Sequence, residues 1–278
     1  MGTLAIIISL ALLMFFAYRG ISVLILAPIM AAVAILLSGD MAYMMPQYTE
    51  TFMSALGGYI LKFFPIFLLG ALFGQLMVDS GAASSISNSI MNKLGHQRAI
   101  LTVVLACGVL TYGGVSLFVV AFAIYPIAKS MFQAANIPKR LIPGAIALGS
   151  FTFTMTALPG SPSIQNAIPI PFFGTNVFAA PGIGIISGLI MFGLGSIWLQ
   201  SRANKARSNG EGYGVDTEEG EKLEDGVTSK GEMPVFLAFL PLLLVIGVNA
   251  LFTYIIFPGM DFSSLKELYP KLDPSKQT

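Results

Sequence analysis

The sequence predicts an all-α polytopic membrane protein. Of its 278 residues, 55% are hydrophobic and only 10% are charged, and the mean hydropathy is +0.79. A soluble domain carries about a quarter charged residues, so this composition indicates a chain that lies largely in lipid. Long apolar segments recur along the chain, and helices are the structure that satisfies a membrane-embedded backbone internally. Two of these segments are interrupted by glycine, proline and hydroxyl residues.

Charge and the rarer side chains exclude several classes of function. The formal net charge is +1 and no basic stripe occurs, so nothing favours nucleic-acid binding. No hydrolytic constellation, phosphate loop or grouped metal ligands are present, and we therefore expect no enzyme, no cofactor and no metal site. Cys107 is the only cysteine and lies in an apolar run, which indicates packing and not chemistry.

The expected elements follow in chain order. The first begins almost at Met1 without a basic start or a cleavage site, so it is expected to be a retained span and not a signal peptide. Residues 79–98 are small and polar and predict an interfacial segment, with a helix as one form it could take. The expected spans are residues 4–18, 21–37, 63–78, 183–199 and 234–257, with two unusual segments at 99–132 and 141–178.

The segment 99–132 is too long for one membrane helix. At about 1.5 Å per residue it would extend roughly 50 Å, against a hydrocarbon core of roughly 30 Å. Its middle reads TYGGVS (residues 111–116), a glycine pair bracketed by hydroxyls. This pattern predicts a re-entrant helical hairpin with its tip at these residues, and two short spans joined by a tight turn are the alternative.

The segment 141–178 contains the stretch ALPGSPSIQN at residues 157–166. Proline removes a backbone donor and stops a helix, while glycine loosens it. At membrane depth such a break survives only where protein or a watery cavity satisfies the freed backbone groups. The stretch predicts a crossing helix with an unwound middle, and an ordinary loop between two spans is the alternative.

The distribution of lysine and arginine gives the expected orientation. These residues collect on the cytoplasmic side of a membrane protein. If the N-terminus lies outside, the outward loops 39–50 and 174–181 contain neither residue. The residues that then fall inside are Arg19, Lys93, Arg98, Lys129, Lys139, Arg140, Arg202, Lys205 and Arg207. The polar, glycine-rich segment 200–233 is expected to be a cytoplasmic linker.

The two interrupted helices are the candidate binding site. A broken helix exposes free N–H groups and a positive dipole end, which hold an anion without a buried cation. Hydroxyl and amide side chains there suit a ligand with several oxygens, and glycines allow a close backbone approach. The candidate substrate-binding residues are Thr111, Tyr112, Gly113, Gly114, Ser116, Gly160, Ser161, Ser163, Gln165 and Asn166. Asp79 is a candidate proton carrier, with a plain helix-end role as its alternative.

These motifs carry a family resemblance. The runs LTYGGVSLFVV (110–120), NIPKRLIPG (136–144) and FTFTMTALPGSPSIQNAIP (151–169) together resemble the gluconate permease (GntP) family of bacterial proton symporters. The resemblance implies uptake of gluconate, another sugar acid or a hydroxybutyrate across the inner membrane, coupled to protons. It also implies the ion-transporter-superfamily fold, in which each of two inverted repeats has a re-entrant hairpin and an unwound helix.

Members of this family are longer than the present chain. We therefore expect residues 1–199 to form the first repeat, 200–233 the linker, and 234–278 the first span of an incomplete second repeat with a polar tail. The expected partners are the substrate, protons and membrane lipid, with a homodimer or a complementing second half as ways to complete the site. The alternatives in function are a sodium-coupled carboxylate carrier of the same superfamily and a truncated, non-transporting membrane subunit.

Overall fold

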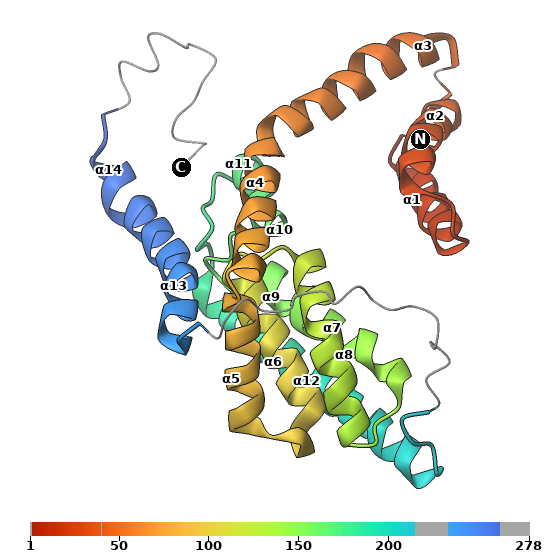
Figure 1. Cartoon of the computed structure of the whole chain (residues 1–278). Helices are drawn as coiled ribbons and strands as arrows, with labels where there is room; N and C mark the ends of the chain where they lie inside the picture. The colour runs from red at the N-terminus through yellow and green to blue at the C-terminus, as the bar shows by residue number, and fades with distance from the viewer. Residues whose placement is uncertain (1, 40, 215–232, 262–278) are drawn as a thin grey trace. The chain divides into compact units, whose positions relative to one another are not determined.

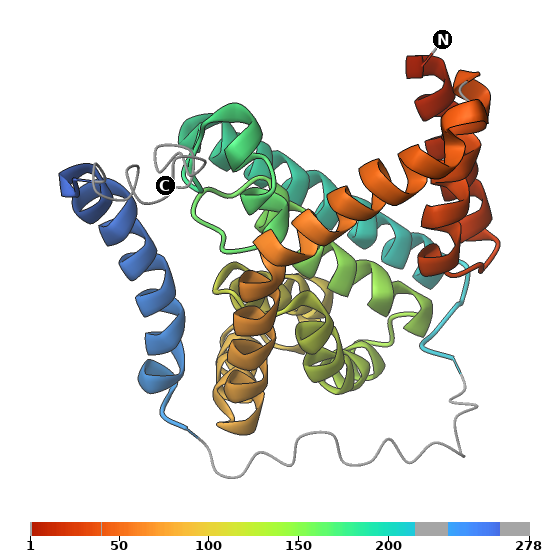
Figure 2. The ribbon, with the colours of Figure 1, turned by 90° about the horizontal axis from the view of Figure 1, so that it is seen from above.

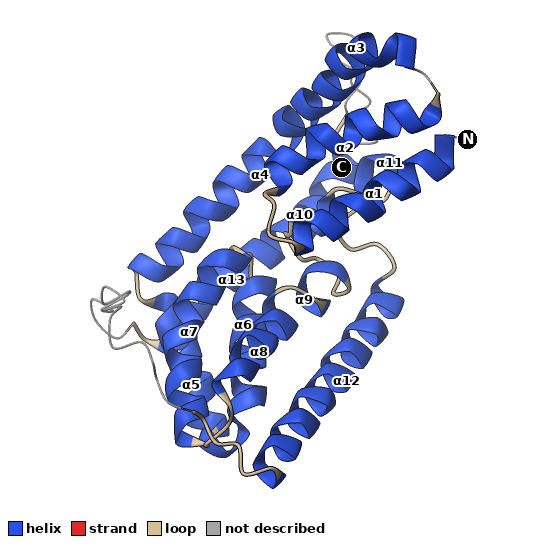
Figure 3. Cartoon of the chain, turned by 90° about the vertical axis from the view of Figure 1, so that its right-hand side faces the viewer, coloured by secondary structure: helices blue, strands red, loops and turns tan. Residues whose placement is uncertain are grey.

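A computed structural model of the chain describes residues 2–39, 41–214 and 233–261. Every regular element in these ranges is a helix, and no strand occurs within them (Figure 3). The predicted all-α class is therefore confirmed. The chain divides into two compact units, Met1–Pro65 and Ile66–Thr278.

Several of the described helices have the dimensions of membrane spans. Those long and apolar enough to cross a bilayer are Met41–Asp79, Leu117–Ala134, Pro181–Ser208 and Val235–Gly259. Shorter apolar helices are Gly2–Tyr18, Val23–Ser38 and Ala99–Tyr112. The last of these has 14 residues, which makes it about 21 Å long and shorter than a hydrocarbon core of roughly 30 Å.

The first unit begins with two apolar helices packed together, α1 (Gly2–Tyr18) and α2 (Val23–Ser38). The hydroxyl of Ser9 on α1 donates to the carbonyl of Met30 on α2 at 2.6 Å. This bond satisfies a polar side chain that is otherwise buried among apolar ones. Helix α2 ends at Gly39, whose left-handed conformation (φ 87°) forms the usual glycine terminus of a helix.

A run of helical residues, 41–79, follows the first two helices. It consists of η1 (Met41–Tyr43), α3 (Met44–Pro46), η2 (Gln47–Phe52, a π-helical stretch) and α4 (Met53–Asp79). The sequence placed the span at residues 63–78, whereas α4 already begins at Met53. The glycine pair at 57–58 lies in open space and is tolerated within the helix at about 1 kcal/mol per residue.

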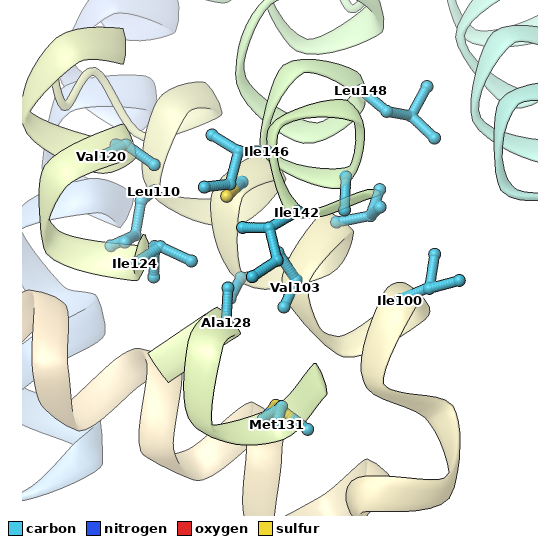
Figure 4. Packing of buried hydrophobic residues seen from close by; sticks show 14 of the residues in the cluster. Ile100, Val103, Leu110, Val120, Ile124, Ala128, Met131, Ile142, Ile146 and Leu148 are labelled. Carbon is cyan, nitrogen blue, oxygen red and sulfur yellow. The ribbon is translucent and has the colours of Figure 1, made fainter. Parts of the chain in front are cut away.

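The second unit is built around helix α6. Helices α5, α7 and α8 all pack against it (Figure 1). These helices are α5 (Ala82–Leu94), α6 (Ala99–Tyr112), α7 (Leu117–Ala134) and α8 (Ile142–Ser150). Ten of the 14 residues of α6 are buried, as expected for a helix that is apolar all round. Its side chains meet those of α7 and α8 in one core, in which Val103, Leu110, Ile124 and Ile142 are almost fully buried (Figure 4).

Glycines set how closely the helices approach. A Cβ atom on Gly149 of α8 would lie 2.5 Å from the carbonyl oxygen of Val104 and 2.5 Å from Cβ of Cys107, both on α6. Gly108 of α6 faces Phe153 in the same way, where an added Cβ would lie 3.4 Å from the ring. Small residues allow this close backbone contact, as they do between membrane helices generally.

Helix α12 (Pro181–Ser208) uses three glycines on one face to pack against α8 and the segment that follows it. A Cβ on Gly184 would meet the carbonyl oxygen of Ala157 at 2.4 Å, and Gly188 and Gly195 lie against leucines of the same region. The sequence ended this span at residue 199, but the helix continues to Ser208. Two cations in its last turn favour this extension because they complement the negative end of the helix dipole.

The residues after α12 fold onto the connection between α7 and α8, which includes η4 (Lys139–Leu141). Arg140 donates from Nε and Nη2 to both carboxylate oxygens of Glu211, at 2.7 and 2.8 Å. The N–H of Tyr213 donates to Asn136 Oδ1 at 2.9 Å, and the N–H of Lys139 donates to the Tyr213 carbonyl at 3.2 Å. Residues 209–214 are thus fixed, whereas most of the predicted linker, residues 215–232, lies outside the described ranges.

The last described helices run from residue 235 to residue 259. They are α13 (Val235–Leu251), the π-helical η5 (Phe252–Ile256) and α14 (Phe257–Gly259). Helix α13 packs against α5 within the second unit (Figure 2). Its leucine at 242 reaches the turn between α6 and α7, where it contacts the candidate site.

Candidate functional site

The turn between α6 and α7 occupies the residues of the predicted hairpin tip. Helix α6 ends at Tyr112, and α7 begins at Leu117. Gly114 has φ +100°, which a side chain would strain, and an added Cβ would lie 3.1 Å from the Pro162 ring. A Cβ on Gly113 would lie 2.4 Å from Leu242 of α13. The glycine pair therefore allows the chain to reverse while two other segments press against it.

The predicted break is also present as an interruption between short helices. Helix α9 (Phe153–Thr156) ends before it, and α10 (Ile164–Ala167) and α11 (Ile170–Phe173) follow it. Gly160, in the middle, has φ +79°, and its N–H donates to the carbonyl of Val177 at 2.8 Å. Part of the backbone freed by the break is thus satisfied by the segment between α11 and α12.

Polar side chains hold the broken segment in shape. Asn166 Nδ2 donates to the carbonyls of Ser161 (3.0 Å) and Val177 (2.9 Å). The Ser163 hydroxyl donates to the Met155 carbonyl at 2.8 Å and accepts from the Ser161 hydroxyl at 3.0 Å. Ser161 is fully buried. The hydrogen-bonding atoms of Ser161 and Asn166 are therefore largely used within the protein.

The tip and the break contact each other directly. The phenolic hydroxyl of Tyr112 donates to the carbonyl of Pro159 at 2.7 Å, although 47 residues separate them. The close approach of Gly114 to Pro162 is a second contact between the same segments. The two interruptions predicted from the sequence thus lie in direct contact.

A cavity of about 290 Å³ opens where the tip and the break meet. Helix α4 supplies a third wall. Of the predicted site residues, those that line the cavity are Thr111, Gly114, Ser116, Ser163 and Gln165. The others, which support the surrounding backbone, are Tyr112, Gly113, Gly160, Ser161 and Asn166.

Sequence reasoning missed the wall that α4 provides. Ile66, Phe67, Gly70 and Ala71 line the cavity, as do Phe118 and Met155 from the other two elements. One signal was available, because Gly70 and Gly74 stand four residues apart on the same face of α4. A Cβ on Gly74 would lie 3.3 Å from the backbone nitrogen of Ser116, so this glycine lets α4 reach the start of α7.

The cavity offers hydrogen-bond donors without a basic side chain. None of the described residues that line it is ionisable in the range of physiological pH. Helix α7 begins at its wall, and Ser116, the residue before the helix, makes no side-chain capping bond. The first N–H groups of a helix lack intrahelical acceptors. Thr111, only 4% exposed, has a hydroxyl without a hydrogen-bond partner among the described residues.

Asp79 lies apart from this cavity. It is the exposed last residue of α4, and its carboxylate accepts a hydrogen bond from Gln75 Nε2 at 2.9 Å. Asp79 is not among the residues that line the cavity. A role in proton movement would therefore require a path between the end of α4 and the site.

A second cavity, also of about 290 Å³, lies between α5 and the start of α13. It is lined by serines and asparagines of α5, by Lys93, and by Met233 and Val235. None of the predicted site residues belongs to it. Among the described residues no group of three histidine, cysteine, aspartate or glutamate side chains is placed to hold a metal ion.

The long apolar helices are those of an integral membrane protein, and the cavity lies between its interrupted helices. The chain belongs to the GntP family of permeases, whose sequence profile matches residues 1–265. Among its relatives, the uncharacterized transporter YxjC of Bacillus subtilis (strain 168) is 49% identical over 286 residues, which cover 99% of this chain and 60% of that protein.

A second relative is an uncharacterized transporter of Haemophilus influenzae. It is 35% identical over 127 residues, which cover 45% of this chain and 30% of that protein. The present chain thus spans about 60% of the length of its Bacillus relative. No solved structure matches the chain significantly.

Proposed function

We propose that the chain takes part in secondary active uptake of a hydroxy-carboxylate, gluconate or a relative of it, across the bacterial inner membrane with protons. Membership of the permease family supports this proposal. In the proposed arrangement the N-terminus lies outside, the α6–α7 pair enters and leaves on the cytoplasmic side, and residues 141–178 cross once. The 14-residue α6, about 21 Å long, supports the re-entrant arrangement because it is shorter than a bilayer core, whereas α7 is long enough to cross one.

The observation that carries the proposal is the donor set at the start of α7. The positive end of this 18-residue helix meets the unpartnered hydroxyl of Thr111 and the uncapped Ser116 at one cavity. A carboxylate bound there would accept bonds from helix N–H groups and from the Ser116 hydroxyl, and a small shift of the buried Thr111 side chain would add its hydroxyl. Such bonds to a charged group contribute about 1.5–3 kcal/mol each, and a helix N-terminus adds about 0.3–2 kcal/mol.

Proteoliposomes test the proposal. The purified chain is reconstituted, and uptake of radiolabelled gluconate and 3-hydroxybutyrate is followed under an inward proton gradient, with an inward sodium gradient as the comparison. We expect proton-driven uptake that a protonophore abolishes. Uptake driven by sodium alone would instead identify the sodium-coupled carrier, and saturable binding without uptake would identify a non-transporting subunit or one half of a transporter.

Two variants connect the activity to the site. Thr111→Val keeps the shape of the side chain and removes its hydroxyl, so we expect substrate affinity to fall about 10- to 100-fold. Thr102→Val is the matched control because Thr102 is also a buried threonine of α6 without a partner, but it does not line the cavity. Equal affinities in both variants would remove Thr111 from the binding site.

The role of Asp79 is tested separately. If this carboxylate carries the coupled proton, Asp79→Asn should abolish uptake driven by the proton gradient but retain substrate binding and substrate exchange. The hydrogen bond from Gln75 shows that an amide at 79 can still be accommodated at the helix end. Unchanged gradient-driven uptake in this variant would leave Asp79 with the helix-end role alone.

A further inference from the structure

We infer that the cavity between α5 and the start of α13 is a binding site for the phosphate headgroup of an anionic phospholipid. This cavity of about 290 Å³ is separate from the one at the interrupted helices, and none of the predicted substrate-binding residues lines it. A lipid bound here would belong to the membrane around the protein and would not be the transported substrate.

One face of α5 gives the cavity its polar wall. Another face of this helix, with Ala82, Ala83 and Ile86, is buried in the core of the second unit. The side chains toward the cavity stand three, four and seven positions apart, a spacing that places them on one side of a helix. They are Ser85, Asn88, Ser89 and Asn92, and Lys93 lies beside them.

These five side chains are available to a ligand. None of them makes a hydrogen bond or an ion pair to another described residue, and Asn88, Asn92 and Lys93 are exposed. Their hydroxyl and amide groups can donate to an oxygen, and the ammonium group of Lys93 adds three donors and a positive charge. No acidic side chain among the described residues lines the cavity. Several donors around one cation are typical of a phosphate site.

The remaining wall of the cavity indicates where the phosphate comes from. It consists of Met233 and Val235. Val235 is the first residue of Val235–Gly259, which is long and apolar enough to cross a bilayer, so the cavity lies near one membrane surface, where headgroups are. A lipid headgroup in the cavity would leave its acyl chains at the apolar start of α13, whereas a free phosphate would gain nothing from this contact.

Native mass spectrometry of the detergent-purified full chain tests this site. The chain is titrated with phosphatidylglycerol and, separately, with phosphatidylcholine, whose headgroup carries no net charge. We expect phosphatidylglycerol to bind about fivefold more tightly, and inorganic phosphate in large excess should not displace it. Equal binding of the two lipids would show that the site does not select an anionic headgroup. Displacement by inorganic phosphate would identify a site for the free ion, and either result would overturn the inference.

Lys93→Gln tests the cation of the site. Loss of one lysine near a membrane surface should weaken the binding of phosphatidylglycerol about fivefold. Lys205→Gln is the matched control, because Lys205 is an exposed lysine in the last turn of α12 and does not line the cavity. Equal losses in the two variants would reduce the effect to general charge attraction and refute the site.

Asn88→Ala with Asn92→Ala tests the uncharged donors. This double variant keeps Lys93 and the net charge, and both side chains are exposed, so the melting curve followed by circular dichroism should not change. Hydrogen bonds to a charged group contribute to affinity, and we expect binding of phosphatidylglycerol to weaken at least about fivefold. Unchanged binding would show that Lys93 attracts the lipid without the cavity, and would overturn the assignment of the headgroup to it.

Discussion

The bond between Tyr112 and Pro159 should couple the two interrupted helices, and Tyr112→Phe tests this directly. The substitution removes one oxygen and leaves the ring in place. The lost hydrogen bond is 2.7 Å long, and its acceptor is a carbonyl in a segment with no helical partner for it. A neutral hydrogen bond contributes about 1 kcal/mol to stability, and the half-buried position lets water replace part of it.

A loss of about 1 kcal/mol corresponds to a decrease in Tm of about 2–4 °C for a chain of this size. The chain provides its own reporter of unfolding, because Cys107 is the only cysteine and is fully buried in the core of the second unit. A maleimide dye that fluoresces on reaction with thiols will label it only when this core opens. The measurement is the dye fluorescence of the purified protein during a temperature ramp.

Tyr125→Phe is the matched control for this measurement. Tyr125 lies on α7, is half-buried, and its hydroxyl makes no hydrogen bond to another described residue. We expect its stability to remain within about 0.5 kcal/mol of the unmodified chain. If both variants melt together, the bond between the tip and the break contributes nothing, and the argument that these segments act as one unit fails.

Two further predictions concern the frame around the site. Gly149→Ala should destabilise the protein by about 1–3 kcal/mol, because the added Cβ would lie 2.5 Å from a backbone oxygen of α6. Gly193→Ala is the control, since Gly193 has open space around it, and this variant should be neutral or slightly stabilising. Size-exclusion profiles after heating compare the two variants. The hydrogen bonds from Arg140 lower the pKa of the Glu211 carboxyl in the folded state. The stabilisation from this pair is therefore fully present above the unfolded pKa of about 4.3 and is lost as the pH falls through the lower pKa of the folded state. The Tm difference between the unmodified chain and Glu211→Gln should therefore shrink in acid, and a difference that is constant from pH 7 to pH 3 would contradict this.

The positions of the two interruptions could be read from the sequence because their causes are local. A glycine pair and two prolines change the backbone wherever they occur, independently of what packs around them. The alternation of apolar segments likewise predicts helices without reference to neighbours. What these patterns cannot specify is which faces meet, since every side of α6 is apolar and ten of its residues are buried.

Apart from the glycine pair at 70 and 74, the wall from α4 could not be predicted for the same reason. Ile66 and Phe67 differ in no local way from the many apolar residues around them, and only their contact with segments about 50 and 100 residues further on places them at the cavity. Gln165 and Asn166 show the limit most clearly. They are adjacent amides with the same chemistry, yet one faces the cavity and the other holds two carbonyls of the broken segment.

This difference predicts two classes of variant with opposite effects. The double variant Ser161→Ala with Asn166→Ala removes bonds that hold the loop and leaves buried carbonyls without donors. At about 1 kcal/mol or more for each bond, it should lower the stability by about 2–4 kcal/mol. Because a Tm responds by about 2–4 °C per kcal/mol, the unfolding transition should fall by several degrees.

The second class acts on the ligand and not on the fold. Thr111→Val with Ser116→Ala removes hydroxyls that make no hydrogen bond to another described residue, so the Tm without ligand should not fall, and the loss of a buried unsatisfied group can raise it. Ligand binding stabilises the folded state by RT ln(1 + [L]/Kd), so the increase in Tm at a fixed substrate concentration should be much smaller in this variant. The loop variant Ser161→Ala with Asn166→Ala, measured below its lower Tm, should retain part of that increase. If instead the loop variant keeps its Tm and loses all response to ligand, Ser161 and Asn166 contact the substrate themselves, and the division between supporting and binding residues is wrong.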